Sequence, residues 1–462
     1  MATRKVVKFF RGENPREDAV FFGEIVRDGL KITAAFGNTN KLTKVTSYYE
    51  RFGERAASSH EAEKRFEALI ESRGKNYEKK DRTEADLPAI DETLDAGSFN
   101  LTLEAEIVAA REPAATKAAA SVYADWLQQQ SDVRGELASL FLAGQEDEAR
   151  EWLAKNPTKL FGDLDVKLNS EVGGLVWEHG FLRGASLKRQ GIDSKTDLAA
   201  LTRAFLALPV ARLVTELRFG LAGYENDNDW SETLAAVAES QQAPQIRVLR
   251  FDDYTSEDSE ISWTAFGDFS PYWSSLPQLE ELVIASGEGG TLGDLALPNL
   301  RKFTRISGGL GEDEITAIFA ARWPKLEHLE VWFGDEHYGG AGKVEHLAPL
   351  LDGRISKKLT HLGIVNCEFV HEVIGPLARS PLLQQLRTLD LSKGALQDTD
   401  VDLLLTHADA FHHLDLLDLS ENLLNARGAE IYARLPHAKV DEQRYGERGD
   451  DEDESRYVAL GE

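Results

Sequence analysis

Apolar residues recur in the second half of the chain at a spacing that is typical of short repeated strands. In the stretch LDLLDLSENLL, residues 414–424, leucines occupy the first, fourth and sixth positions and an asparagine occupies the ninth. Seven earlier stretches keep this pattern, although the fourth of them lacks the apolar sixth position. The apolar sets are Val214, Leu217, Phe219; Ile246, Leu249, Phe251; Leu279, Leu282, Ile284; Leu300, Phe303; Leu326, Leu329, Val331; Leu359, Leu362, Ile364; Leu386, Leu389, Leu391; and Leu414, Leu417, Leu419. Because alternate side chains on a strand share a face, the fourth and sixth positions are predicted to face one core.

These sets resemble the repeats of leucine-rich-repeat proteins, and successive sets are 21 to 33 residues apart. The resemblance implies an α/β fold: a solenoid of about eight repeats over residues 166–440, each contributing one strand and a returning segment. The stretch GGLVWEHGFLRGASL, residues 173–187, has alternating apolar positions that include Val176 and Phe181. It predicts a strand that caps the first repeat, since a solenoid has to shield its terminal apolar edge.

The ninth position of a repeat is occupied by Cys367 in one stretch and by Asn422 in the last. The repeat family uses asparagine or cysteine there to satisfy backbone amides along the turn. We therefore predict a structural role for Cys367 and not a nucleophilic one. A single cysteine also cannot form an internal disulfide, which is typical of a reducing compartment.

Residues 1–82 are predicted to form a small α+β domain. KVVKFF reads as a first strand, and AVFFGEIVRDGLKITAAFG reads as two strands joined at Asp28-Gly29, a dipeptide that suits a tight hairpin. The next stretch, YYERFGERAA, is expected to be irregular. A helix is expected after it, because Ser58 and Glu61 have the spacing of a capping box and Gly74 provides a stop signal.

This segment resembles a WGR domain, the DNA-contacting module of some poly(ADP-ribose) polymerases. The resemblance rests on the hairpin, the AFGN at its end, the capped helix and the closing GKNYE. The Trp-Gly-Arg of the family aligns with Phe36-Gly37-Asn38, so that a neutral amide replaces the arginine. The resemblance implies nucleic-acid contact through residues Phe36, Gly37, Asn38, Lys41 and Lys44. The alternative is that Phe36 belongs to the core and Gly37 to a turn.

Between the first domain and the repeats, residues 83–98 are predicted to be an acidic linker, and residues 99–165 to be helical. Val122, Trp126 and Leu127 share one face of a helix, and SDVRGE is expected to break the helix and restart it. The stretches VYADWL and DVRGEL resemble the repeat-companion domain that precedes degenerate repeats in myxobacteria and planctomycetes, a family with no established activity. We expect Tyr123, Asp125, Trp126 and Arg134 to pack in a helical hairpin in which Asp125 and Arg134 are hydrogen-bonded or paired.

Charge divides the chain into two parts. Of its 462 residues, 52 are Lys or Arg and 79 are Asp or Glu, which gives a net charge of −27. Residues 1–82 hold 18 basic and 13 acidic residues, a balance of +5, so residues 83–462 carry 34 against 66, or −32. Residues 441–462 are predicted to be an acidic tail whose last residues, RYVALGE, are able to fold back as a strand. No apolar run of 18 residues occurs, so we expect a cytoplasmic protein without a membrane span.

With the leucines facing the core, positions three, five and seven of each repeat are predicted to line the concave surface. Position five changes from cations in the early repeats to carboxylates in the late ones, an order that would orient a dipolar partner or that arose by chance. Its residues are Arg218, Arg250, Val283, Thr304, Glu330, Gly363, Asp390 and Asp418. The predicted binding face consists of Arg218, Arg250, Glu281, Lys302, His328, Glu330, Trp332, His361, Asp390 and Asp418.

His328 and His361 occupy position three of adjacent repeats, with Glu330 and Trp332 near them. Two imidazoles and a carboxylate are suitable ligands for a transition metal. However, no local spacing of a known zinc motif is present, so we expect no metal and no other cofactor. We expect instead that Trp332 packs against a partner, since tryptophan is enriched at the centres of interfaces.

The chain lacks the phosphate-binding loops, the HExxH helix and the CxxC pair that mark common enzyme classes. We therefore expect a non-enzymatic scaffold that binds a protein on its repeats and docks a second macromolecule through residues 1–82. The alternative is a nucleic-acid-binding adaptor in which residues 1–82 contact DNA or RNA and the repeats recruit a partner. An enzyme hidden around Asp125 and Arg134 is a third hypothesis, but it lacks a nucleophile and base at a recognisable spacing. The identity of the partner and the oligomeric state do not follow from the sequence.

Overall fold

The computed structural model divides into two compact units. The N-terminal unit comprises residues 1–168, 177–183 and 201–213, and the repeat unit comprises residues 169–176, 184–200 and 214–462. The structure describes residues 5–11, 19–28, 31–40, 44–55, 64–70, 99–164, 172–189, 194, 196–224, 227–287, 289–425, 427–444 and 456–461. No helix in this described part of the chain is both long enough and apolar enough to cross a membrane.

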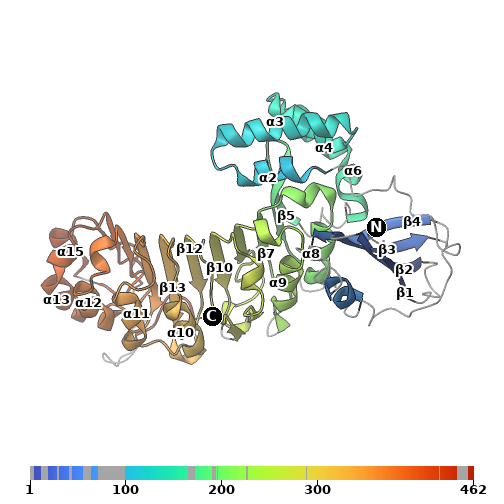
Figure 1. The fold of residues 1–462 in the computed structure, drawn as a ribbon. Helices are drawn as coiled ribbons and strands as arrows, with labels where there is room; N and C mark the ends of the chain where they lie inside the picture. The colour runs from blue at the N-terminus through green and yellow to red at the C-terminus, as the bar shows by residue number, and fades with distance from the viewer. Residues whose placement is uncertain are drawn as a thin grey trace. The chain divides into compact units, whose positions relative to one another are not determined.

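A four-stranded antiparallel sheet forms the first part of the N-terminal unit (Figure 1). Its strands, in spatial order, are β1 (Lys5–Arg11), β2 (Ala19–Asp28), β3 (Lys31–Asn40) and β4 (Lys44–Arg55). Asp28 pairs with Lys31, so the predicted hairpin is confirmed, with only Gly29 and Leu30 between its strands. The expectation of an irregular stretch after it was wrong, because residues 48–55 pair with β3 as part of β4.

The predicted helix after this sheet is present at residues 64–70, and its Phe66 side chain is buried. Ser58, Glu61 and Gly74, on which the predicted helix ends depend, lie outside the described residues, as does the predicted acidic linker at residues 83–98. The helix itself is therefore confirmed.

Five short helices follow in the same unit. They are α2 (Leu101–Ala109), α3 (Pro113–Gln129), α4 (Val133–Leu142), α5 (Glu146–Lys155) and α6 (Pro157–Phe161). Asp132 caps α4, because its carboxylate accepts a hydrogen bond from the Arg134 amide at 3.0 Å. A Cβ at Gly135 would lie 2.7 Å from the Gln128 nitrogen, so glycine permits the close approach of α3 and α4. The predicted break and restart of the helix are confirmed.

Two details of the helical prediction were wrong. Val122 is 52% exposed, and Tyr123 takes its place in the core beside the predicted Leu127. Arg134 pairs with Asp132 at 2.7 Å and not with Asp125, which is exposed. The capping aspartate lies two residues from the arginine and is itself nearly buried, so it offers the nearer and better desolvated carboxylate.

An eleven-stranded sheet forms the framework of the repeat unit. Its spatial order is β17-β16-β15-β14-β13-β12-β10-β8-β7-β6-β5, and the pairs from β6 to β17 are parallel. The strands are β5 (Val172–Glu178), β6 (Phe181–Leu187), β7 (Glu216–Phe219), β8 (Val248–Phe251), β10 (Glu281–Ala285), β12 (Lys302–Ile306), β13 (His328–Gly334), β14 (His361–Cys367), β15 (Thr388–Asp390), β16 (Leu416–Asp418) and β17 (Ala438–Lys439). The predicted single cap strand is in fact a pair, β5 and β6, separated by His179 and Gly180.

The strand register aligns the fourth position of the predicted sets from β7 to β16, and all of these residues are buried. They are Leu217, Leu249, Leu282, Phe303, Leu329, Leu362, Leu389 and Leu417. The returning segments contain short helices that lie along one side of the sheet (Figure 1). These helices are α9 (Ser231–Ala238), α10 (Glu312–Ala320), α11 (Ala348–Leu351), α12 (Val370–Ala378), α13 (Val401–Thr406), α14 (Ala408–Phe411) and α15 (Gly428–Arg434). The fold is leucine-rich-repeat-like: a parallel ladder of strands with returning helices.

The sixth position of the off-pattern set is Arg305, and its side chain is fully buried. Its guanidinium donates to both oxygens of Glu314 on α10, at 2.7 and 3.2 Å. The remaining N–H groups reach the backbone oxygens of Ser286, Ile306 and Gly287. The arginine therefore takes the place of an apolar residue because a carboxylate and three carbonyls satisfy it.

The predicted structural role of the ninth position is confirmed. Asn422 is fully buried; its Nδ2 donates to the Leu391 oxygen at 2.9 Å, and its Oδ1 accepts from the Leu396 amide at 3.0 Å. Cys367 is also buried, and burial raises the pKa of its thiol well above the ordinary value. A protonated, inaccessible thiol is a poor nucleophile.

The last described residues, 456–461, lie against the ends of the repeat strands. Asn366 on β14 donates to the Leu460 oxygen at 2.6 Å and accepts from the Leu460 amide at 2.8 Å. Arg456 pairs with Asp400 at 2.8 Å. The predicted return of the C-terminal residues is therefore present, but without a strand assignment.

Candidate binding face on the repeat strands

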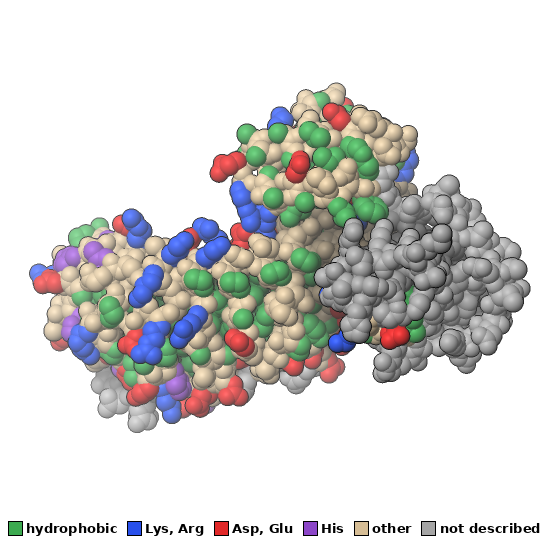
Figure 2. All heavy atoms as spheres, in the orientation of Figure 1, with side chains coloured by type: hydrophobic (Ala, Val, Ile, Leu, Met, Phe, Trp, Pro, Cys, Tyr) green, Lys and Arg blue, Asp and Glu red, His purple; other side chains and the backbone are tan. Residues whose placement is uncertain are grey.

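The side chains that alternate with the buried leucines form one polar surface, which we call the ladder face. It consists of positions three, five and seven of the strands from β7 to β16. Figure 2 shows basic and acidic side chains interspersed over the repeat unit. On the ladder face their order follows the strand register, so side chains on neighbouring strands become neighbours in space.

The early part of the ladder face, on β7 to β12, is a network of ion pairs. Arg218 and Arg250 each lie 2.6 Å from a carboxylate oxygen of Asp252. Arg250 also reaches Glu281 at 2.8 Å, and Glu281 lies 3.6 Å from the Lys302 ammonium. The hydrogen bond that Arg250 donates to Asp252 raises the pKa of Arg250 against the effect of its burial. The cationic end of the expected charge order is thus compensated within the protein.

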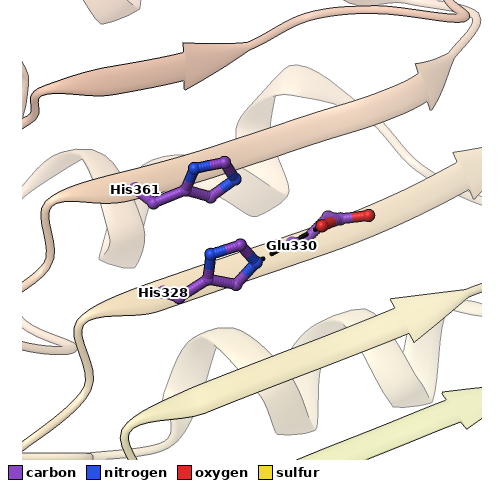
Figure 3. A group of neighbouring side chains, drawn as sticks. All are labelled: His328, Glu330 and His361. Atoms are coloured by element: carbon purple, nitrogen blue, oxygen red, sulfur yellow. Dashed lines mark hydrogen bonds and ion pairs between the residues drawn. The ribbon is translucent and has the colours of Figure 1, made fainter. Parts of the chain in front are cut away.

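The late part of the ladder face, on β13 to β16, contains the two predicted histidines. His328 and His361 are partners in the β13–β14 register, and their rings stack with centroids 3.8 Å apart and planes 9° apart. His328 Nε2 lies 3.3 Å from Glu330 Oε2 (Figure 3). The structure therefore brings together the three side chains that the sequence placed near one another.

Trp332 and Gly363 also determine the position of the Glu330 carboxylate. The Trp332 indole donates to Oε1 at 2.7 Å, which leaves Oε2 directed to His328. On the neighbouring strand, a Cβ at Gly363 would lie 2.9 Å from Glu330 Cγ, so glycine provides the space for this carboxylate. The Lys393 ammonium lies 5.8 Å from the centroid of the Trp332 ring.

The charges of this cluster follow from its burial. Burial raises the pKa of Glu330, but the hydrogen bonds from His328 and Trp332 outweigh it, and the net shift is downward. Burial, and then the neighbouring His328, lower the pKa of His361 to about 4. At neutral pH the cluster therefore pairs an ionised carboxylate with a neutral His361.

Two further carboxylates continue the late part of the face. Asp390 accepts from the Ser392 amide at 2.8 Å, and burial raises its pKa, with Asp418 and Glu330 adding to the effect. Asp418 accepts from the Ser420 amide at 2.9 Å and lies 3.6 Å from the Lys439 ammonium. The Ser420 hydroxyl also donates to Asp418, at 2.5 Å, so backbone amides and a serine hydroxyl are the donors to these carboxylates.

The predicted nucleic-acid residues belong to the N-terminal unit. Phe36, Gly37 and Asn38 lie on β3, Lys44 begins β4, and Lys41 lies outside the described residues. The β3–β4 register shifts between Phe36 and Gly37 and again between Asn38 and Thr39. Irregular pairing of this kind is frequent at sheet edges and beside functional sites.

Two residues of the ladder face were missed by the sequence reasoning. Asp252 is the acceptor that both early arginines share, and Gly363 makes room for Glu330. Asp252 was detectable, since it occupies position seven of its repeat, two residues after Arg250. The role of Gly363 depends on contact between strands 33 residues apart and has no signal within its own repeat.

The chain matches no family model and no curated protein. Among solved structures, it is similar to a Bacteroides fragilis protein from a structural genomics consortium, with 22% identity over 96% of this chain and 97% of that chain and a TM-score of 0.48. An internalin from Listeria monocytogenes shares 13% identity over 57% of this chain and 87% of that one, with a TM-score of 0.22. Likenesses this weak assign no function, so the description of the fold rests on the strand register itself. The resemblances to WGR and repeat-companion domains stay predictions.

Proposed function

We propose that the ladder face binds a protein partner and that the chain acts as an interaction scaffold without catalytic activity. The observation that carries the proposal is the order of this face: its long side chains are already held by one another. Arg250 is fixed by Asp252 and Glu281, and Glu330 by His328 and Trp332. A surface ordered in advance loses less side-chain entropy when a partner binds.

The late part of the face is proposed as the centre of this interface. It combines a partly exposed tryptophan with the carboxylates of Glu330, Asp390 and Asp418. Aromatic anchors beside carboxylates favour a partner segment with cationic side chains. The early arginines are engaged with acidic neighbours and are proposed to contribute to the rim.

The test is quantitative capture from a lysate with immobilised full-length protein. Trp332→Ala is compared with Tyr432→Ala, which removes an aromatic side chain that is 57% exposed on helix α15. We expect a captured protein that is lost with Trp332→Ala and retained with Tyr432→Ala. Equal capture by both variants, or a loss shared by both, would contradict binding at the ladder face.

A second candidate function is nucleic-acid binding through residues 1–82. It is supported by the local charge of +5, by the WGR resemblance and by the irregular register at Phe36-Gly37-Asn38. We expect full-length protein to bind nicked DNA with an affinity that falls as salt rises, because phosphate contacts release counterions. Fluorescence anisotropy of wild type and a Lys41→Glu/Lys44→Glu variant measures this. Absence of binding at low salt, or an unchanged affinity in the variant, would contradict it.

A further inference from the structure

The stacked histidines and Glu330 form the one group of three such side chains, in the part of the chain that the structure describes, whose geometry suits a metal ion. One ligand atom from each of the three residues lies within 4.8 Å of the other two. They come from adjacent parallel strands, where the register fixes His328 opposite His361 (Figure 3). A rigid sheet is a suitable support for a site whose ligands have to be placed accurately.

The Nε2 atom of His361 is buried and has no hydrogen-bond partner among the described residues. A buried polar nitrogen without a partner is destabilising, and in a native protein it calls for an explanation. A bound cation would explain the unpartnered nitrogen, because the cation accepts the lone pair of Nε2. Glu330 Oε2 lies 3.3 Å from His328 Nε2, so these two ligand atoms are already close together.

A second layer of contacts also resembles that of a metal site. The indole of Trp332 donates to the carboxylate oxygen of Glu330 that faces away from His328. Hydrogen bonds of this kind orient ligands in metal sites, and their removal typically lowers affinity about 10- to 100-fold. Gly363 leaves the carboxylate free to take this position.

We propose that His328, Glu330 and His361 bind one Zn²⁺ ion through two imidazole nitrogens and one carboxylate oxygen. Zinc is favoured over calcium and magnesium because two of the three ligands are imidazoles. Ligand distances in such sites are about 2.0–2.2 Å, so two nitrogens on one ion lie at most about 4.2 Å apart. The ligand atoms lie within 4.8 Å of one another, so a small tilt of the two stacked rings, which makes their lone pairs converge, brings the nitrogens within this limit.

Three protein ligands leave a fourth position for water or for a side chain of a partner. The neighbouring charges do not block the ion. The Lys302 ammonium is held by Glu281 at 3.6 Å, and Asp390 lies on the next strand beyond Gly363. The zinc site is inferred independently of the proposed protein interaction, and either stands if the other fails.

The experiment is calorimetric titration of ZnCl₂ into full-length protein that has been treated with a chelator and freed of it. We expect one ion per chain in wild type, with affinity lowered at least about tenfold in each of His328→Gln, His361→Gln and Glu330→Gln. His337→Gln is the matched control, since His337 also contacts a carboxylate, Asp335, at 2.7 Å, but the two form no such three-residue group. It should bind as wild type does.

A spectroscopic measurement keeps the test decisive if a histidine variant folds poorly. Co²⁺ bound by nitrogen and oxygen ligands in place of Zn²⁺ gives visible absorption bands that report the ligand set. We expect these bands in wild type and His337→Gln, and altered bands with weaker binding in Trp332→Phe, which keeps an aromatic ring but loses the indole donor. Absence of one-to-one binding in wild type, or unchanged binding in a His328→Gln/His361→Gln variant, would overturn the proposal.

Discussion

The two parts of the ladder face satisfy their carboxylates in different ways. On the early strands, Asp252 and Glu281 are paired with the permanent cations Arg218 and Arg250. On the late strands, Glu330 accepts from the Trp332 indole and lies against the His328 imidazole, whereas Asp390 and Asp418 accept from backbone amides. The Ser420 hydroxyl also donates to Asp418, and the Lys439 ammonium lies 3.6 Å from it. The sequence shows the change from cations to carboxylates along position five of the repeats. The comparison shows that this change does not tell which of these charges are free to contact a partner. The early charges are largely compensated, whereas the late cluster retains capacity for a ligand.

Strand β12 is the last strand of the early part, and its buried Arg305 depends on Glu314. Replacing Glu314 by alanine would leave a fully buried guanidinium without its carboxylate, so we expect the free energy of unfolding to fall by about 3–5 kcal/mol. Urea unfolding followed by tryptophan fluorescence measures this change. Glu312→Ala, at an exposed position on the same helix, should change it by less than about 0.5 kcal/mol. Similar losses in the two variants would show that the ion pair between β12 and α10 does not stabilise the fold.

The late repeats depend on neutral hydrogen bonds as well, and Asn422 is their clearest case. Asn422→Ala removes an acceptor from the buried Leu396 amide and a donor from the Leu391 oxygen. We expect the free energy of unfolding to fall by about 1–3 kcal/mol. The exposed Asn425→Ala variant is the control in the same urea experiment. If Asn422→Ala lowers the free energy of unfolding no more than the control does, water replaces the hydrogen bonds of the Asn422 side chain.

The space beside Glu330 offers a sharper test of the late cluster. Gly363→Ala would place a methyl group 2.9 Å from Glu330 Cγ and displace the carboxylate from His328. We expect the zinc affinity to fall roughly tenfold, as when supporting contacts of a ligand are lost. Gly174→Ala, at a position where a Cβ meets open space, serves as the control. Equal zinc affinities of both variants in calorimetry would show that the space at Gly363 does not position the Glu330 carboxylate.

The smallest effect is expected in the early network. The side chains of Arg250 and Glu281 are 34% and 24% exposed, and each has a second partner. A double-mutant cycle with Arg250→Ala and Glu281→Ala should give a coupling free energy of about 0.2–1 kcal/mol that decreases with salt. A larger, salt-independent coupling would show that this network is structural to the same degree as the Arg305 pair.

The periodic part of the fold was predictable from the sequence because each leucine position reports the same local geometry. Leu217, Leu362 and Leu417 each fall on a strand in the predicted register. The burial of Arg305 was not predictable, since it depends on a carboxylate from a helix and on carbonyls of the preceding turn. Strand β4 was missed because its polar residues give no clear alternation, and its pairing with β3 decides its conformation.

The candidate site also has a part that the sequence predicted and a part that it did not. The adjacency of His328 and His361 follows from the repeat spacing, and the structure places them in stacking contact. The sharing of Asp252 by two arginines and the space at Gly363 depend on side-chain contacts between strands, which a repeat pattern does not specify. Sequence reasoning therefore located the face but not its internal pairing.

We propose that the late part of the ladder face carries most of the partner-binding free energy and that the early part contributes only at the rim. The most direct test compares Glu330→Gln with Glu281→Gln, the same substitution on the two parts, in binding titrations against the partner captured by wild type. We predict that Glu330→Gln weakens binding at least about tenfold and that Glu281→Gln weakens it less than about threefold. Equal effects, or a larger effect of Glu281→Gln, would contradict the claim.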